Sequence, residues 1–166
     1  RATEGKRPGG TPTALPGGNY IGADLDTPGT PLGLSLKKIR AACEGMELED
    51  FGLETEDEIY GLITPVQKTD LINLAIEVEN IRNGKPGMLL GVNWLFSNRV
   101  PKDSSGNRLI PIWSKANVVA GVWQDVEGDM WNDTSAKNLP YIYTDAYIDC
   151  VRVEDLGVRI IRCAEA

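Results

Sequence analysis

Residues 140–163 read PYIYTDAYIDCVRVEDLGVRIIRC, and this stretch decides the fold because it carries the clearest strand-forming pattern in the chain. β-Branched and aromatic residues dominate it. Glu154–Gly157 (EDLG) interrupts the pattern with turn-forming residues. The stretch therefore predicts a β-hairpin with one strand on each side of that turn.

The first strand of this predicted hairpin has two mixed faces, because successive side chains point to opposite sides of a strand. One face would carry Tyr143, Asp145, Tyr147, Asp149, Val151 and Val153. The other would carry Thr144, Ala146, Ile148, Cys150 and Arg152. Neither face is cleanly apolar. This favours an ordinary edge strand, although a strand that packs partly on another surface has the same pattern.

The composition is that of a globular protein. A chain of 166 residues suits one domain with its own core, and 42% hydrophobic with 25% charged residues is ordinary for such a domain. No apolar run approaches the roughly 18 residues that cross a bilayer. The first ten residues, RATEGKRPGG, lack the apolar core of a signal peptide. We expect no membrane insertion.

Charge, cysteine and histidine content exclude several function classes. A net charge of −7 argues against nucleic-acid binding as the main activity, because phosphate binding needs clustered Lys and Arg. Cys43, Cys150 and Cys163 are too widely spaced for a CxxC metal pair, which indicates reduced, mostly buried thiols and an intracellular origin. The absence of histidine removes Ser-His-Asp and Cys-His nucleophiles and the common zinc sites.

The first half of the chain predicts an irregular lead-in followed by two helices. Residues 1–33 are crowded with Gly and Pro, so we expect an extended, loop-rich segment. A helix should begin after the Ser35 N-cap and end near Gly45 or Leu48. An acidic connector, 47–58, leads to a short strand at 58–63. A second helix should follow Thr64, with Pro65 at its first position, and close at 83–84 (NG).

The second half predicts strands. Residues 88–97 should form one buried strand with Gly91 at a bend, and 109–113 another, on either side of a polar loop at 101–107. The apolar spacing of 116–134 fits a short helix followed by a strand.

Three further patterns have chemical interpretations. Exposed tryptophans could stack on sugars, which makes a small β-rich carbohydrate- or protein-binding module an alternative function. Carboxylates spaced by four could share a helical face and bind a cation. A carboxylate-based hydrolase is a further alternative. The tryptophans are Trp94, Trp113, Trp123 and Trp131. The carboxylates spaced by four are Asp125, Asp129 and Asp133, and the hydrolase would use Glu54, Glu56 and Asp57.

Five segments in a fixed order carry a family resemblance. They are 33–42 (GLSLKKIRAA), 58–75 (EIYGLITPVQKTDLINLA), 92–101 (VNWLFSNRVP), 112–123 (IWSKANVVAGVW) and 143–165 (YTDAYIDCVRVEDLGVRIIRCAE). Together they resemble the C-terminal part of tailed-bacteriophage major capsid proteins of the HK97 type, in detail the group related to the P22 coat protein.

The resemblance implies an α+β fold, the HK97-like capsid fold, with an axial domain and the returning part of a peripheral domain. Residues 1–33 would be the lead-in, 34–115 axial-domain-like and 116–166 peripheral-domain-like. No N-terminal arm, extended loop or spine helix is recognisable in this sequence, so we expect about half of a capsid subunit to precede Arg1.

The implied function is structural rather than enzymatic, and no cofactor is expected. The subunit would self-associate into pentamers and hexamers of an icosahedral shell, located in the virion capsid and assembled in the host cytoplasm. It would enclose double-stranded DNA, which it contacts only non-specifically. A scaffolding protein is a further partner that the family allows.

Shell subunits associate through wide surfaces with aromatic and Arg anchors and with charge pairs that set the register. The candidates for these subunit contacts are Arg99, Lys102, Asp103, Trp131, Arg152 and Arg159. We also expect Tyr143, Tyr147 and Val151 to be more exposed than their chemistry favours.

Overall fold

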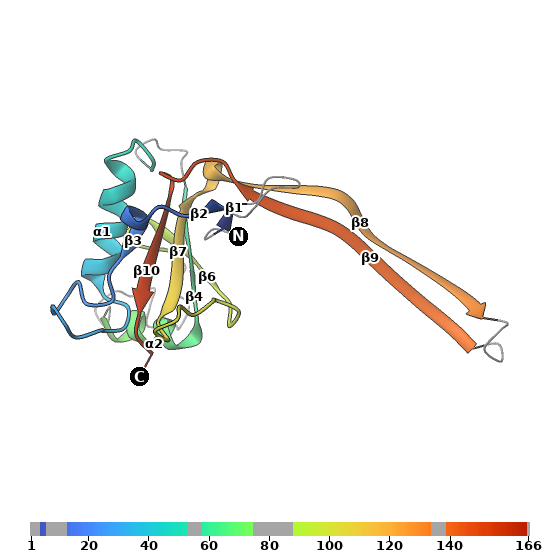
Figure 1. Ribbon diagram of the computed structural model, residues 1–166, viewed down its shortest axis with the longest axis horizontal. Coiled ribbons are helices and arrows are strands. Elements are labelled where there is room, and N and C mark those ends of the chain that lie inside the picture. Colours follow the sequence, from blue (N-terminus) through green and yellow to red (C-terminus); the bar gives the residue numbers. More distant parts are fainter. Residues whose placement is uncertain (1–3, 6–12, 53–57, 75–87, 134–138, 166) are drawn as a thin grey trace.

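The computed structural model describes residues 4–5, 13–52, 58–74, 88–133 and 139–165. Within them, a body of one six-stranded sheet and two α-helices carries a long two-stranded hairpin that projects from it (Figure 1). The sheet order is β3 (Tyr20–Ile21), β10 (Val158–Cys163), β7 (Arg108–Ser114), β4 (Ile59–Ile63), β6 (Val92–Phe96) and β5 (Met88–Leu89). The hairpin consists of β8 (Val118–Asp133) and β9 (Leu139–Arg152).

The lead-in is irregular, as predicted, but it is attached to the sheet. β1 (Glu4–Gly5) pairs with β2 (Thr13–Ala14), and a 3-10 turn, η1 (Gly17–Asn19), precedes β3. β3 adds to the edge of the sheet parallel to β10. The early strand β3 therefore lies beside β10, the last strand of the chain that the structure describes.

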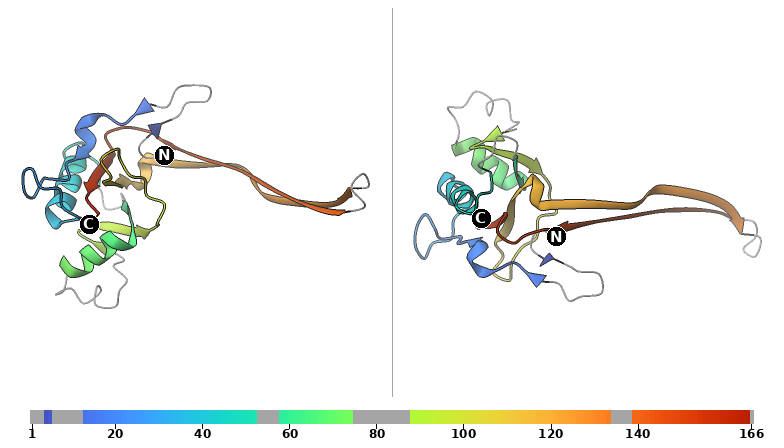
Figure 2. Two further views of the ribbon diagram at one scale, coloured as in Figure 1. Left: turned by 60° about the horizontal axis from the view of Figure 1, so that its bottom comes forward. Right: turned by 90° about the horizontal axis from the view of Figure 1, so that it is seen from above.

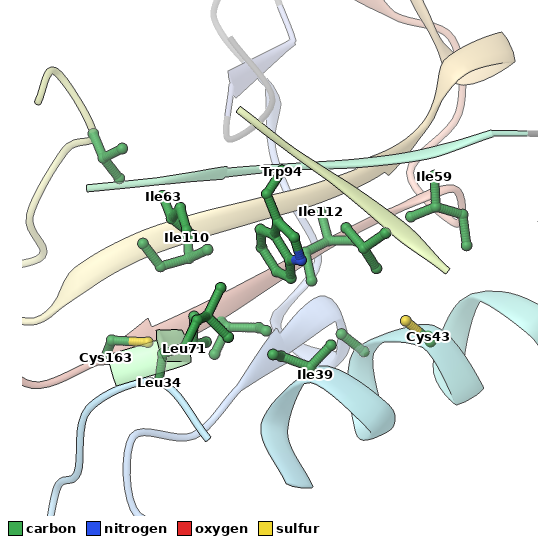
Figure 3. Close-up of a cluster of buried hydrophobic side chains, with 14 of the residues drawn as sticks. Leu34, Ile39, Cys43, Ile59, Ile63, Leu71, Trp94, Ile110, Ile112 and Cys163 are labelled. Atoms are coloured by element: carbon green, nitrogen blue, oxygen red, sulfur yellow. The ribbon is translucent and has the colours of Figure 1, made fainter. Parts of the chain in front are cut away.

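The helix α1 (Leu36–Glu47) confirms the first predicted helix and its cap. The Ser35 side chain accepts a hydrogen bond from the Lys38 backbone N–H at 3.2 Å. Ile39 and Met46 are fully buried on the face that the apolar spacing predicts. This face covers the sheet, and Figure 3 shows Ile39 and Cys43 pointing toward the strand residues of the core.

The helix α2 (Pro65–Leu74) confirms the second predicted helix start. The backbone N–H of Thr64 donates to Oε1 of Gln67 at 3.2 Å, and the Thr64 hydroxyl binds the same oxygen. Leu71 is fully buried against the core. The predicted continuation through 75–84 lies outside the described residues, as do 53–57 of the acidic connector.

Three predictions about the second half were wrong. Residues 88–97 form a tight hairpin, β5–β6, instead of one bent strand. Its two central residues, Leu90 and Gly91, both have positive φ, at 56° and 76°, which is the conformation of a two-residue hairpin turn. Leucine rarely takes the first of these positions, so the usual Asn-Gly or Asp-Gly pattern was missing.

The predicted hairpin of residues 140–163 was also wrong, because its two strands belong to different sheets. β9 pairs with β8, while β10 pairs with β7 and β3 in the body. The expected helix in 116–134 is instead a 3-10 turn, η2 (Lys115–Asn117), followed by the whole of β8. β8 contains register shifts between Val122 and Gln124 and between Gln124 and Glu127, and these disturb the alternation that identifies a strand.

Candidate functional site

The β8–β9 hairpin is the candidate site because it exposes both of its faces. Tyr143, Tyr147 and Val151 are 49%, 57% and 44% exposed, which confirms the expectation for these side chains. Monomeric soluble proteins rarely expose contiguous apolar patches of this kind, and such patches usually mark interaction surfaces. Both strands are paired only along their shared edge in the described residues.

One face of the hairpin carries no charged side chain along most of its length. Residues that pair directly across an antiparallel ladder lie on the same face. Ala120 pairs with Cys150, Val122 with Ile148, Gly128 with Thr144, and Met130 with Ile142. We call these eight residues, with Ala146, the apolar face. Pairing thus combines the β9 pattern with a matching set from β8, while Thr144 and Arg152 on the same side agree with the expectation that neither face is cleanly apolar.

The opposite face carries the carboxylates and the tyrosines, and we call it the acidic face. Glu127 and Asp145 lie directly opposite each other, and the Gln124 side-chain amide donates to both, at 3.0 and 3.3 Å. The Tyr143 hydroxyl donates to Asp145 at 2.9 Å, which raises the pKa of Tyr143. Asp149 lies farther along this face, opposite Gly121.

The tryptophans do not form one stacking platform. Trp94 is buried in the core, and Trp113 is half-buried and stacks on Tyr60 with ring centroids 6.2 Å apart. Trp131, an interface candidate, lies on the acidic face and stacks on Tyr141 at 6.2 Å. Trp94 and Trp113 lie on opposite faces of the body sheet, and Trp123 and Trp131 lie on the hairpin, so a common sugar-binding row is not favoured.

Two of the predicted interface arginines are buried and bind groups of their own chain. Arg152 forms an ion pair with Asp155 where the hairpin joins the body. The Arg159 guanidinium donates to the backbone oxygens of Gly45 and Leu156, and burial lowers its pKa. Sequence patterns do not distinguish these positions from exposed arginines. Their role at subunit contacts stays a prediction.

The other charged candidates lie on the loop between β6 and β7. Arg99 is exposed. Lys102 pairs with Glu165 at 2.8 Å. The Asp103 carboxylate accepts hydrogen bonds from the backbone N–H groups of Ser105 and Asn107, both at 2.9 Å, so it orders the predicted polar loop. The proposed subunit contacts of these three residues also stay predictions.

The Glu165 carboxylate should make stability depend on acid pH. Hydrogen bonds from Lys102, Arg108 and Gln67 hold the pKa of Glu165 at about 2, below its ordinary 4.5. Because the folded state binds the proton more weakly than the unfolded state, this contribution is full above pH 4.5 and is lost as the pH falls toward 2. We expect Glu165→Gln to be less stable than the unmodified protein at pH 7 and the difference to shrink across this window.

Urea unfolding at pH 7 and pH 3 measures that difference. Lys102→Met removes the strongest partner of Glu165 and should move the window toward pH 4.5. A stability difference that is the same at both pH values would contradict the assignment.

The described residues hold no group of three or more His, Cys, Asp or Glu side chains that could bind a metal ion. Asp125 and Asp129 lie on β8, so the helical carboxylate face does not form. Glu54, Glu56 and Asp57 lie outside the described residues. No described helix has the length and apolar character needed to cross a bilayer.

Comparisons with known proteins give one family model and several solved structures of similar fold. The family model described as "Phage capsid protein" matches residues 1–165. The capsid of Cyanophage P-SCSP1u aligns with a TM-score of 0.64 and 16% identity, over 99% of this chain and 58% of that chain. A chain of Mycobacterium phage Che8 aligns with a TM-score of 0.59 and 13% identity, over 74% and 46%.

A third solved structure, the capsid of an empty GTA particle, aligns with a TM-score of 0.57 and 13% identity, over 88% of this chain and 50% of that one. The present chain therefore spans about half the length of the solved chains it matches. No curated protein sequence gives a significant match.

Proposed function

Because the chain belongs to the phage capsid protein family, we propose that it is a structural subunit of an icosahedral bacteriophage shell. Its α+β architecture is the HK97-like capsid fold, as the sequence resemblance predicted. The role is structural and requires no catalytic group. The observation that carries the proposal is the projecting hairpin, whose apolar face has no cover among the described residues.

We assign the domains by sheet membership. The six-stranded sheet with α1 and α2 is the axial domain, and the β8–β9 hairpin is the returning part of the peripheral domain. β3 comes from the predicted lead-in and β10 from the predicted peripheral segment, yet both pair in the body sheet. The proposed axial domain therefore includes these two strands, and the peripheral part spans 118–152.

In the proposed shell, copies of the subunit associate into pentamers and hexamers that close around double-stranded DNA. The solved neighbours include capsids, which supports assembly of identical subunits. The hairpin contributes large exposed side chains to these contacts, among them Met130 and Ile142, which are 68% and 76% exposed. The carboxylates of the acidic face would repel DNA, which fits enclosure without tight binding. Assembly would take place in the host cytoplasm, with a scaffolding protein as an additional partner.

Electron microscopy of the full-length gene product tests the proposal. We expect closed shells or capsomer rings from the unmodified protein, and none from Met130→Glu/Ile142→Glu, because two charges on the apolar face cannot be buried without partners. A matched control, Ser104→Glu/Ser105→Glu, adds the same charge to the exposed loop of the body and should assemble normally. A persistent monodisperse monomer that binds glycans would refute the shell and support the binding module.

A further inference from the structure

The hairpin joins the body through two short connections, which we call the root: η2 (Lys115–Asn117), which enters β8, and residues 153–157, which leave β9 toward β10. Figures 1 and 2 show that the hairpin leaves the body at one end of the sheet and extends away from it in every view. The direction of the hairpin therefore depends on how the root is held.

Asn117 holds the two sides of the root together. It is only 2% exposed. Its side-chain amide donates to the Glu154 carbonyl oxygen at 2.7 Å, and its side-chain oxygen accepts from the Glu154 N–H at 2.8 Å. Its own carbonyl oxygen accepts from the Val153 N–H at 2.9 Å. Three directional bonds thus join one buried asparagine to two consecutive residues of the opposite connection.

Asn19 holds the root to the body. This residue ends η1 and is 6% exposed. Its amide donates to the backbone oxygen of Val158 at 3.1 Å and to that of Asp155. The connection 153–157 is therefore bound on the hairpin side by Asn117 and on the body side by Asn19. We call this pair the asparagine clamp.

Packing at the clamp leaves no room for a side chain at Gly157. A Cβ atom at Gly157 would lie 2.6 Å from Nδ2 of Asn117 and 2.9 Å from Cε1 of Phe51. The backbone N–H of Ser114 donates to the Gly157 carbonyl oxygen at 3.1 Å, and that of Lys115 to the Glu58 oxygen at 2.9 Å. Both connections are thus fixed to the body sheet.

The length of the hairpin amplifies any change at the root. β9 has 14 residues, and at about 3.3 Å per residue the hairpin is about 45 Å long. A rotation of about 10° at the root would therefore move its tip by about 8 Å, more than the separation of two neighbouring strands. Apolar side chains could fill the same space, but the hydrophobic effect is non-directional, whereas hydrogen bonds favour one relative orientation of their partners.

We propose that the asparagine clamp of Asn19 and Asn117 sets the angle between the body and the hairpin, and that this angle determines the curvature of the assembled shell. The first half of the inference concerns the subunit alone. The second half rests on the proposed function. Asn19 and Asn117 are positioning residues, which act through the hairpin rather than through contacts of their own with another subunit.

Spin-label distances in the unassembled full-length protein test the angle directly. Labels at Glu44→Cys, an exposed position of α1 on the body, and at Asn132→Cys near the hairpin tip, in a Cys150→Ser background, should give a narrow distance distribution. We expect Asn117→Ala to raise the population outside the main distance peak about tenfold, because two directional side-chain hydrogen bonds are lost. Asn19→Ala should broaden the distribution as well. Asn107→Ala, which removes the Asn107 side-chain bond to Asp103 in the distant loop, is the matched control and should leave it unchanged.

Micrographs of the same variants test the curvature. Asn117→Ala and Asn19→Ala should give open sheets or shells of altered diameter, and Asn107→Ala shells of the original diameter. Unchanged distance distributions in both clamp variants would overturn the inference, and so would a broadened distribution with shells of unchanged diameter. If Asn117→Ala fails to fold, Asn117→Ser and Asn19→Ala decide by the same criteria. If the unmodified protein forms no shells, the proposed function fails, while the distance measurements still decide the angle.

Discussion

Replacing Trp94 with alanine is expected to lower the free energy of unfolding by about 3 to 5 kcal/mol, the usual range for removing a buried aromatic side chain. Trp94 is 4% exposed and lies at the centre of the main core cluster. Figure 3 shows it among Ile39, Ile110 and Ile112, between the sheet and α1. A Cβ atom at Gly61, its partner on β4, would lie 2.5 Å from the Trp94 ring, so this glycine provides the space for the indole.

Two variants identify the source of that loss. The Trp94 indole N–H is buried and has no hydrogen-bond partner among the described residues. Trp94→Phe should therefore be much milder than Trp94→Ala, because it removes an unpaired donor while keeping a ring in place. Leu95→Ala, at a 45% exposed position on the other face of β6, should change stability by only about 0.5 kcal/mol. Denaturant unfolding followed by circular dichroism measures all three, and equal losses at both positions would contradict the packing argument.

Replacing Arg159 with alanine is expected to cost about 2 to 4 kcal/mol. The guanidinium is buried and donates to carbonyl oxygens of Gly45, Leu156 and Val158, and hydrogen bonds from a charged donor are stronger than neutral ones. Gly45 lies in the last turn of α1, where a positive charge also stabilises the helix. The interaction therefore ties β10 to α1, and its loss removes this donor from the carbonyl oxygens of Gly45 and Leu156.

Arg162 on the same strand is the matched control. Its guanidinium lies over the Tyr20 ring, 4.9 Å from the ring centroid, and its side chain is 43% exposed. Arg162→Ala should cost only about 0.5 to 1 kcal/mol, the value of an exposed cation–π contact. Thermal or urea unfolding of the two variants gives the comparison. An Arg159→Ala loss no larger than that of Arg162→Ala would show that the buried bonds contribute nothing.

The helices of the body could be predicted because their signals are local. Ser35 caps α1 and Gln67 completes the capping box of Thr64 within three residues, so the sequence contains both partners of each bond. The family resemblance supplied the fold class that these local signals could not. Strand pairing was harder to predict from the sequence, because the partner of a strand is set by contacts with residues far along the chain.

The β8–β9 hairpin could not be predicted from local sequence patterns. Two register shifts around Gln124 move the apolar residues of β8 off strict alternation, and their spacing then resembles a helix. Because β8 was not predicted as one long strand, residues 140–152 had no predicted partner strand before them. The segment that forms β10 was the nearest strand in the sequence and was predicted as the partner. The apolar face could not be recognised either, because four of its nine residues belong to β8.

Sequence patterns also did not show which of the candidate subunit-contact residues are buried. Arg99 is exposed, whereas Arg152 and Arg159 are buried and hydrogen-bonded within the chain. Arg152 and Arg159 each stand between two β-branched residues, as solvent-exposed arginines of strands often do, and only the fold determines that both are buried with partners nearby. The clamp residues Asn19 and Asn117 had no sequence signal, because asparagine in a loop is ordinary and its value here depends on backbone groups of distant segments.

The position of the hairpin between β7 and β10 has a consequence for the order of folding. These two strands are neighbours in the sheet, yet the whole hairpin separates them in the chain. If β7 and β10 pair before the hairpin forms, the chain must bring together the two ends of a long flexible loop, which costs entropy. If β8 and β9 are already paired, the hairpin holds those two ends close together. Hairpins also form in microseconds, faster than contacts between distant segments. We therefore expect the β8–β9 hairpin to form first and to place β10 between β7 and β3, so that the proposed contact surface exists before the body that carries it is complete.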